Sequence, residues 1–196
     1  MLDLYSRYVV AWMVALRQNA DLASHFVRDA VQRAGIAPGT LFTHQDRGAP
    51  MTSRSLALTY ADLGVVPSFS RPRVSNDNPF SESQFKTLKY RPEFPGRFVS
   101  IEHGLEFCGT FFHWQNHEHH HWGLGLLTPA VVHYGQADMV LSARQAVLAE
   151  RFVRQPPQPL GLPSEVWINP PADAPEPRML ELPRDTNFVP QLSQIH

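Results

Sequence analysis

The chain has 196 residues, of which 43% are hydrophobic, and its formal net charge is −1 at pH 7. This length corresponds to one full domain and a remainder. No stretch approaches the ~20 apolar residues of a membrane span, and the first residues lack the pattern of a signal peptide. A single cysteine, Cys108, excludes an internal disulfide framework and is typical of a reducing compartment. We therefore expect a cytoplasmic protein with a sizeable core.

Charge is distributed unevenly along the chain. Residues 1–100 contain 12 Lys and Arg against 8 Asp and Glu, whereas residues 101–196 contain 5 against 10. A basic first half suits contact with a polyanion, but ordinary solvated surfaces show similar local charge. Charge alone therefore leaves nucleic-acid binding open.

The first 20 residues favour β structure. Residues 2–5 and 8–16 are rich in Val, Tyr, Trp and Leu, which predicts two short strands joined by a tight turn at Ser6-Arg7, or one bent strand. Asn19 is a predicted N-cap for a helix that ends near Gly35. The next predicted elements are a strand at 40–44, a helix at 53–63 ended by Gly64, and a strand at 65–69.

Helices dominate the next part of the chain. A polar loop, SRPRVSNDN, precedes a predicted helix at 79–89 with proline in its first turn. Three further helices are predicted at 101–114, from Pro129, and at 137–153. The helix at 101–114 is expected to place Leu105, Cys108, Phe111 and Phe112 on one face.

This order of elements describes an α/β domain over residues 1–154. Ten of the 18 prolines lie between Pro156 and Pro190, so residues 155–196 read as a Pro-rich tail. Its expected docking point on the domain is the segment 166–168.

Two acidic residues stand where a metal site could form. Asp46 lies where a predicted strand meets a turn, and Glu82 lies one turn into a predicted helix, with 35 residues between them. Mg²⁺ is usually bound by one or two carboxylates together with water and substrate phosphate, and two such ions assist phosphoryl transfer. Lys86 and Lys89 share the helix face of Glu82, where a nucleic-acid backbone could lie. A solvated Glu–Lys pair is the alternative explanation.

Three segments carry a resemblance: HQDRGAPMTS, SFSRPRVSNDNPFSESQFKTLK and HHHWGLGLLTPAVVHYG. Together they resemble the integrase-type catalytic core of bacterial insertion-sequence transposases, a core that retroviral integrases share. The spacing between Asp46 and Glu82 matches the second and third carboxylates of the D,D(35)E signature. Asp-Arg-Gly and Asp-Asn-Pro-x-x-Glu in register with that spacing make the resemblance specific over about residues 1–155.

The resemblance implies a ribonuclease-H-like mixed sheet flanked by helices, and DNA strand transfer assisted by Mg²⁺ or Mn²⁺. It implies that Asp46 and Glu82 are catalytic metal ligands that converge on one side of the domain. It also implies that Lys86 and Lys89 contact DNA phosphate, with Asn78 and Arg47 on the same nucleic-acid side. Thr52 and Ser53 are expected to cap the helix after Asp46. The implied partners are insertion-element ends, target DNA, and other copies or full-length transposase.

The first carboxylate of the signature has no match in this sequence. In the family it lies one strand upstream of the segment that resembles LDLYSR, and Asp3 matches a different position on the following strand. We therefore expect a core truncated at its N-terminus, lacking its first, central strand, and inactive in strand transfer.

The histidines do not predict a zinc site. His117, His119, His120 and His121 are nearly contiguous, so they cannot all face one ion, and no cysteine pair accompanies them. His44 lies two residues before Asp46, and either a place near the metal or a place in the core is open to it.

Three functions remain open from the sequence. The first is a DNA-recombining enzyme or a remnant of one. The second is a non-catalytic DNA-binding or subunit-pairing module that modulates full-length transposase. A nuclease of the same broad fold, with water as nucleophile, is the third.

Overall fold

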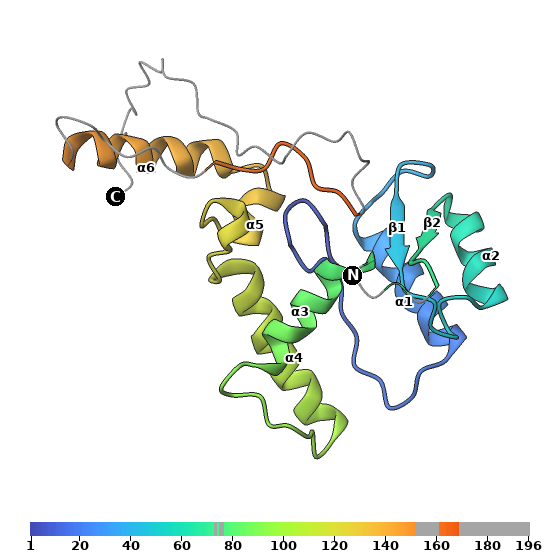
Figure 1. The fold of residues 1–196 in the computed structure, drawn as a ribbon. Coiled ribbons are helices and arrows are strands. Elements are labelled where there is room, and N and C mark those ends of the chain that lie inside the picture. Colours follow the sequence, from blue (N-terminus) through green and yellow to red (C-terminus); the bar gives the residue numbers. More distant parts are fainter. Residues whose placement is uncertain (73, 75–76, 152–160, 169–196) are drawn as a thin grey trace.

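The computed structural model describes residues 1–72, 74, 77–151 and 161–168, and it has an α/β fold (Figure 1). The fold class expected from the sequence is thereby confirmed. In chain order the elements are α1 (Ala20–Arg33), β1 (Phe42–Gln45), α2 (Arg54–Leu63), β2 (Val66–Phe69), α3 (Pro79–Lys89), α4 (Ile101–His117), the 3-10 helix η2 (Trp122–Leu124), α5 (Pro129–His133) and α6 (Ala137–Arg151). No helix among these described residues is long and apolar enough to cross a membrane.

Local capping signals set the helix boundaries. The Asn19 side chain accepts a hydrogen bond from the Leu22 amide at 2.7 Å, as the predicted N-cap of α1. The Ser53 side chain caps α2 in the same way, and α2 ends at Gly64, which adopts the left-handed conformation with φ 64°. A side chain at position 64 would also meet the backbone of Gly39 at 2.8 Å, so two constraints favour glycine here.

The sheet of the described residues is smaller than expected. β1 and β2 pair in parallel, with Phe42 opposite Val66 and Gln45 opposite Phe69. The two strands predicted at 2–5 and 8–16 are wrong, because that segment forms one antiparallel bridge, between Leu2 and Val9. The predicted turn is present, and Arg7 occupies it with φ 60°. β-prone side chains form a strand only when a neighbouring backbone edge is available, and the sequence pattern cannot reveal that edge.

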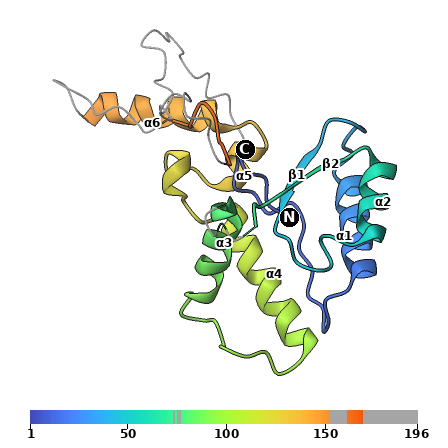
Figure 2. The ribbon, with the colours of Figure 1, turned by 45° about the vertical axis from the view of Figure 1, so that its right-hand side comes forward.

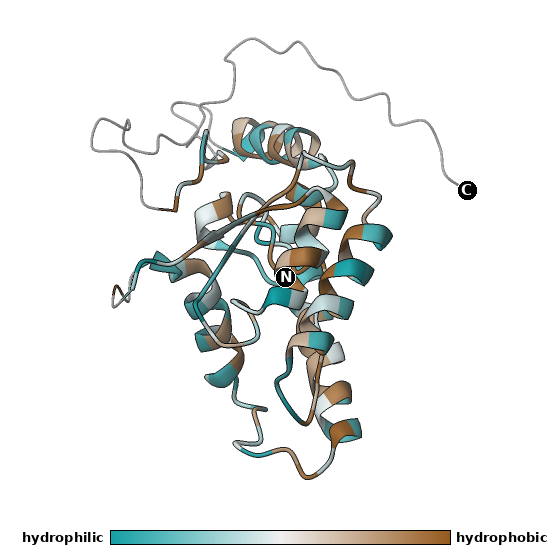
Figure 3. Cartoon of the chain, turned by 90° about the vertical axis from the view of Figure 1, so that its right-hand side faces the viewer, coloured by the Kyte–Doolittle hydropathy of each residue, from teal (hydrophilic) through white to brown (hydrophobic). Residues whose placement is uncertain are grey.

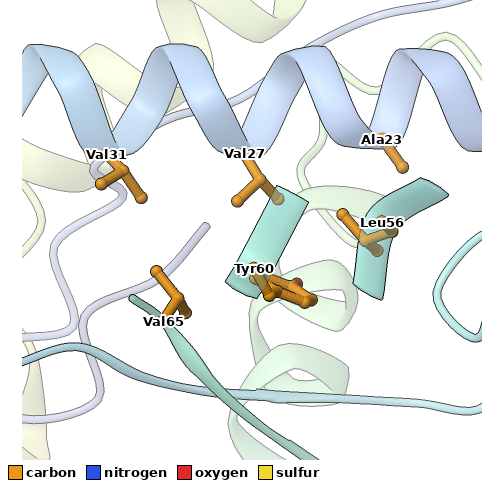
Figure 4. Close-up of a cluster of buried hydrophobic side chains, with 6 residues drawn as sticks. All are labelled: Ala23, Val27, Val31, Leu56, Tyr60 and Val65. Atoms are coloured by element: carbon orange, nitrogen blue, oxygen red, sulfur yellow. The ribbon is translucent and has the colours of Figure 1, made fainter. Parts of the chain in front are cut away.

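Two separate apolar clusters stabilise the fold. The first joins α1, α2 and the residue before β2, and Figure 4 shows its side chains pointing toward one another; it comprises Ala23, Val27, Val31, Leu56, Tyr60 and Val65. The second lies around η2, α5 and α6 and comprises Leu124, Leu127, Val132, Ala137 and Leu141. Figure 3 shows hydrophobic and hydrophilic residues mixed around the helices, as expected for helices with one buried face.

Residues 1–19 run between the group formed by α1, α2 and the sheet and the group formed by α3 and α4 (Figures 1 and 2). The Asn116 side chain of α4 holds this segment, since it accepts from the Val9 amide at 2.8 Å and donates to the Val9 carbonyl at 3.1 Å. Asn116 is 6% exposed, so its amide replaces a strand partner for a buried backbone unit.

Two further expectations need correction. Helix α4 continues past residue 114 to His117, and its expected apolar face is incomplete, because Phe111 is buried but Leu105 is 42% exposed. The docking of the C-terminal region lies earlier than residues 166–168. Leu162 packs against the second apolar cluster, whereas Trp167 is 46% exposed. The expected tail residues 155–160 and 169–196 lie outside the described residues.

Candidate functional site

Asp46 follows β1 directly and lies in the turn that leads toward α2. Its Oδ1 accepts a hydrogen bond from the Gly48 amide at 3.1 Å, and the side chain is exposed. A Cβ atom at position 48 would lie 3.2 Å from that oxygen, a tight contact that glycine avoids. Ser53 is the N-cap of α2, as expected, whereas the Thr52 hydroxyl instead points back to the Gly48 carbonyl at 3.4 Å.

Glu82 lies in the first turn of α3, and its side chain is exposed. Asn78 is the N-cap residue of α3, although its side chain makes no capping hydrogen bond, and Pro79 begins the helix. Asp46 lines a cavity together with the α3 face formed by Ser81, Gln84, Phe85 and Leu88. Glu82 is not among the lining residues and lies on a neighbouring face of the helix. Asp46 and α3 thus border the same cavity, while the convergence of the two carboxylates stays a prediction.

A hydrogen-bonded path joins the flanks of Asp46 to Ser70. The Ser70 amide donates to the Gln45 carbonyl at 3.0 Å, and Arg47 Nε donates to the Ser70 carbonyl at 2.8 Å. Arg47 also lies over the Phe69 ring, 5.9 Å from its centroid. The residues before and after Asp46 therefore hold the chain at the end of β2. Arg47, which the sequence placed on the nucleic-acid side, has this structural partner.

The path continues from Arg71 to the start of α3. Asp77 is 1% exposed, and its carboxylate accepts from the Arg71 amide at 2.7 Å, from Nε at 2.9 Å and from a terminal guanidinium nitrogen at 2.8 Å. Bonds to the Asp77 carboxylate raise the pKa of Arg71 above its usual value. We call this arrangement the Arg71–Asp77 clamp. It fixes the residue that immediately precedes Asn78, and hence the point from which α3 begins.

The sequence did not reveal this clamp. Its members read as polar residues of a loop, and side-chain pairing across six positions follows no helical or strand period. A buried aspartate is the exception among acidic residues, but burial cannot be seen in a loop sequence. The one signal in the sequence is that Asp77 directly precedes the Asn-Pro pair at which the helix begins.

Lys86 and Lys89 lie in the last turns of α3 and are exposed. The ion pairs of the described residues join Arg28 to Asp62, Arg33 to Asp29, Arg71 to Asp77, Arg91 to Glu93 and His133 to Asp3. Neither lysine takes part in them, so the expected alternative of a Glu82–Lys86 pair is not formed. Both ammonium groups are available to an external anion.

Asp3 is engaged elsewhere in the molecule. Its carboxylate accepts from the Ser6 hydroxyl at 2.6 Å and from the Tyr5 amide at 2.9 Å, and it lies 2.9 Å from His133 Nδ1 at the end of α5. Burial alone would raise the pKa of Asp3, but the hydrogen bonds from Ser6, His133 and Tyr5 outweigh it and lower the pKa. Tyr8 stacks on the His133 ring at 4.4 Å. This carboxylate therefore ties the N-terminal turn to α5.

The histidines have structural partners. His44 Nδ1 lies 2.8 Å from the Ser68 hydroxyl and Nε2 lies 3.3 Å from the Ser70 hydroxyl, so the imidazole joins β1 to β2. The His121 side chain caps η2 by accepting from the Gly123 amide at 3.0 Å. Burial, followed by the positive charges of Arg7 and His119, lowers the pKa of His121 to about 4. His121 is therefore neutral at pH 7.

Comparison with known proteins identifies the class. Residues 1–75 match one family model and residues 63–129 match a second, and both are described as an integrase core domain. Asp46 lies in the first match and Glu82 in the second, so the two matches together support an integrase-type core over residues 1–129. No curated protein matches the chain.

Two solved structures are similar at low identity. The catalytic core domain of BIV integrase has a TM-score of 0.46 and 17% identity, over 70% of this chain and 85% of that one. A chain of the simian T-cell lymphotropic virus intasome, in complex with the PP2A regulatory subunit B56 gamma, has a TM-score of 0.42 and 16% identity over 53% of this chain. This protein spans 36% of the length of that intasome chain.

Integrase cores normally use divalent metal ions, so we tested whether the residues present fit one. The oxygen ligands of Asp46 and Glu82 suit a hard cation such as Mg²⁺. However, the described residues contain no group of three or more His, Cys, Asp or Glu side chains that could hold a metal ion. The three-carboxylate set implied by the resemblance is therefore not assembled in the described part of the chain.

Proposed function

We propose that this protein acts in DNA integration or transposition by holding DNA along α3, and that residues 1–196 alone give no metal-dependent strand transfer. The observation that carries the proposal is the pair of unpaired, exposed lysines on the helix that also bears Glu82. Phosphate contacts from such cations supply most of the affinity of sequence-independent DNA binding. The two matches to integrase core domains support DNA as the polyanion.

Within this proposal Asp46 and Glu82 are the family's second and third carboxylates. The path through Ser70 and the Arg71–Asp77 clamp joins the segments that carry them. Asn78 begins the helix of Glu82, and Arg47 keeps its neighbour Asp46 in place. These residues position the pair, while Lys86 and Lys89 meet the DNA backbone.

A second candidate function is a non-catalytic DNA-binding or subunit-pairing module that assembles with other integrase-core chains. The contacts of Asp3 with Ser6 and His133 favour this candidate, because they hold the Asp3 carboxylate in the N-terminal turn, where it does not serve as a third metal ligand. Both candidates expect DNA binding, and neither expects turnover by residues 1–196. They differ in assembly with another integrase-core chain, so sedimentation of this protein with and without such a chain separates them.

DNA binding is tested by the salt dependence of affinity for duplex DNA. The double variant Lys86→Gln/Lys89→Gln should reduce the magnitude of the log–log salt slope by about 1.8, since each lost phosphate contact contributes about 0.9. A matched control, Arg33→Gln/Arg151→Gln, removes the same charge from the ends of α1 and α6 and should leave the slope unchanged. Equal slopes for the wild type and the lysine variant would contradict the assignment of α3.

The sequence offers a second readout, because Lys86 and Lys89 are its only lysines. Amine-reactive footprinting should therefore report on this helix, and duplex DNA should protect both positions. For turnover, we expect no product from residues 1–196 with either metal. Activity that disappears in both Asp46→Asn and Asp3→Asn would refute the inactivity and make Asp3 the third ligand.

A further inference from the structure

A cavity of about 550 Å³ separates the two halves of the molecule. One wall comes from α1 and the turn at 46–51, and the other comes from α3 and α4, with residues 1–19 running along it. The second apolar cluster contributes no residue to its lining, whereas the first borders it through Ala23 and through Met51, which packs against that cluster. Residues 1–19 are the segment that passes between the two groups in Figures 1 and 2.

The interior of the cavity is apolar on both sides. Leu22 and Phe26 of α1 face it from one side, and Leu88 and Phe112 of α3 and α4 face it from the other. The charged side chains that line it, Asp46 and Arg17, are exposed, and the N-terminal amine of Met1, which also lines it, donates to the Ala11 carbonyl. An occupant must therefore carry apolar groups on two opposite sides and polar groups at its ends.

The cavity also offers hydrogen-bonding groups without partners. The Nε2 atom of Gln84, a lining residue, is buried and has no hydrogen-bond partner. Residues 12–16 form neither helix nor strand, and no hydrogen bond involves their backbone within the described part of the chain. Three of them, Trp12, Met13 and Ala15, line the cavity. Backbone groups left unpaired beside an apolar volume form a template for an added strand.

We propose that this cavity is a docking groove for one extended peptide segment of another polypeptide, which pairs with residues 12–15 as an added strand. Backbone hydrogen bonds to the added strand supply affinity in this mode of recognition, and side-chain pockets supply specificity. A strand covered on both faces is a continuous apolar run rather than an alternating one. The chemistry of the partner is therefore a run of about four Val, Ile or Leu residues with polar flanks, a cation being favoured beside Asp46.

The single cysteine makes the proposal testable. Cys108 lines the cavity and is half-buried, and burial raises the pKa of its thiol. Its rate of modification by N-ethylmaleimide at fixed pH therefore reports whether the cavity is filled. The probe is the acetylated and amidated peptide Lys-Val-Ile-Val-Ile-Lys. At ten times its Kd, about nine-tenths of the protein is occupied, so modification should slow about tenfold and the thermal midpoint should rise.

Three controls decide between occupants. The same peptide with alternate N-methylated residues keeps its apolar surface but loses donors, and it should not protect Cys108. Ala15→Trp should fill the groove and abolish protection by the probe, whereas Ala61→Trp, on the exposed surface of α2, should preserve it. Retained helical circular dichroism confirms that both variants are folded.

The following results would overturn the proposal. Equal protection by the N-methylated peptide would mean that the cavity takes any apolar ligand. Protection that grows with protein concentration, with dimers in sedimentation, would make a second copy the occupant. Cys108 that is unreactive in the free protein would mean that the groove is closed in solution.

Discussion

The Arg71–Asp77 clamp makes a sharp prediction about stability. Asp77 is 1% exposed and accepts three charge-assisted hydrogen bonds, whereas the Arg71 side chain is 63% exposed. Asp77→Ala removes the acceptors and leaves the Arg71 amide without this partner, while the guanidinium regains water. Hydrogen bonds to charged groups contribute about 1.5–3 kcal/mol each but are not additive, so we expect a loss of about 2–4 kcal/mol. Asp77→Asn keeps the shape and one acceptor and should lose about 1–2 kcal/mol.

Urea unfolding followed by circular dichroism measures these differences, with the slope of the transition checked for constancy. Hydrogen exchange adds a local readout, because the clamp fixes the residue before Asn78. The first turn of α3 should exchange faster in Asp77→Ala, while α1 keeps its protection in native conditions. A change below about 0.5 kcal/mol, the usual range for surface substitutions, would refute the clamp.

Three further predictions concern packing and pH. Asn116→Ala should cost about 1–3 kcal/mol in thermal unfolding, because it leaves a buried Val9 amide and carbonyl unpaired. Asn116→Asp should restore little of this loss at neutral pH, since its carboxylate cannot donate to the Val9 carbonyl and is costly to bury. Leu56→Ala should cost about 2–5 kcal/mol, since Leu56 is 0% exposed in the first apolar cluster; a smaller loss would show that α1 and α2 move together to fill the space left by the leucine. The pKa of His121 is lowered to about 4 in the folded state, so the stability that its neutral form contributes is present above the unfolded pKa of about 6.5 and is lost as the pH falls toward 4. His121→Asn keeps a capping oxygen for Gly123 and should flatten the dependence of the unfolding free energy on pH across this window, by about 1–2 kcal/mol after allowance for partial exposure; an unchanged dependence would contradict the burial of His121.

Local signals in the sequence predicted much of the helical structure. Asn19, Ser53 and Gly64 act through contacts within four residues of the chain, so their caps could be predicted without knowledge of the fold. The bounds of α3 were predicted in full, and its start follows from Pro79, which can begin a helix but cannot donate within one. In each case the signal lies in the residue itself and its near neighbours in the chain.

Contacts between distant segments could not be predicted in the same way. Residues 8–16 have a strand-like composition, but strand formation requires an edge that the described structure does not bring to them. Asn116 replaces that edge at Val9 across 107 positions. At the candidate site, the spacing of Asp46 and Glu82 singled out the two segments of the predicted metal site, and the helical period placed the two lysines on the face of Glu82. The link between them depends on Ser70 and on the burial of Asp77, which no periodicity encodes.

The weak anchoring of α3 connects the cavity to the candidate site. This helix buries a single residue, Leu88, near its C-terminal end, and the Arg71–Asp77 clamp fixes the residue ahead of its N-cap. Phe85 lies between these two points, lines the cavity and is 60% exposed. A strand docked in the groove would bury Phe85 and give α3 a packed face along its whole length. Asp46 lines the same cavity, so the occupant would contact Asp46 itself and the helix that carries Glu82. Since the lysines lie on a different face of α3, DNA binding should survive without the occupant, whereas the relative position of Asp46 and Glu82 should depend on it.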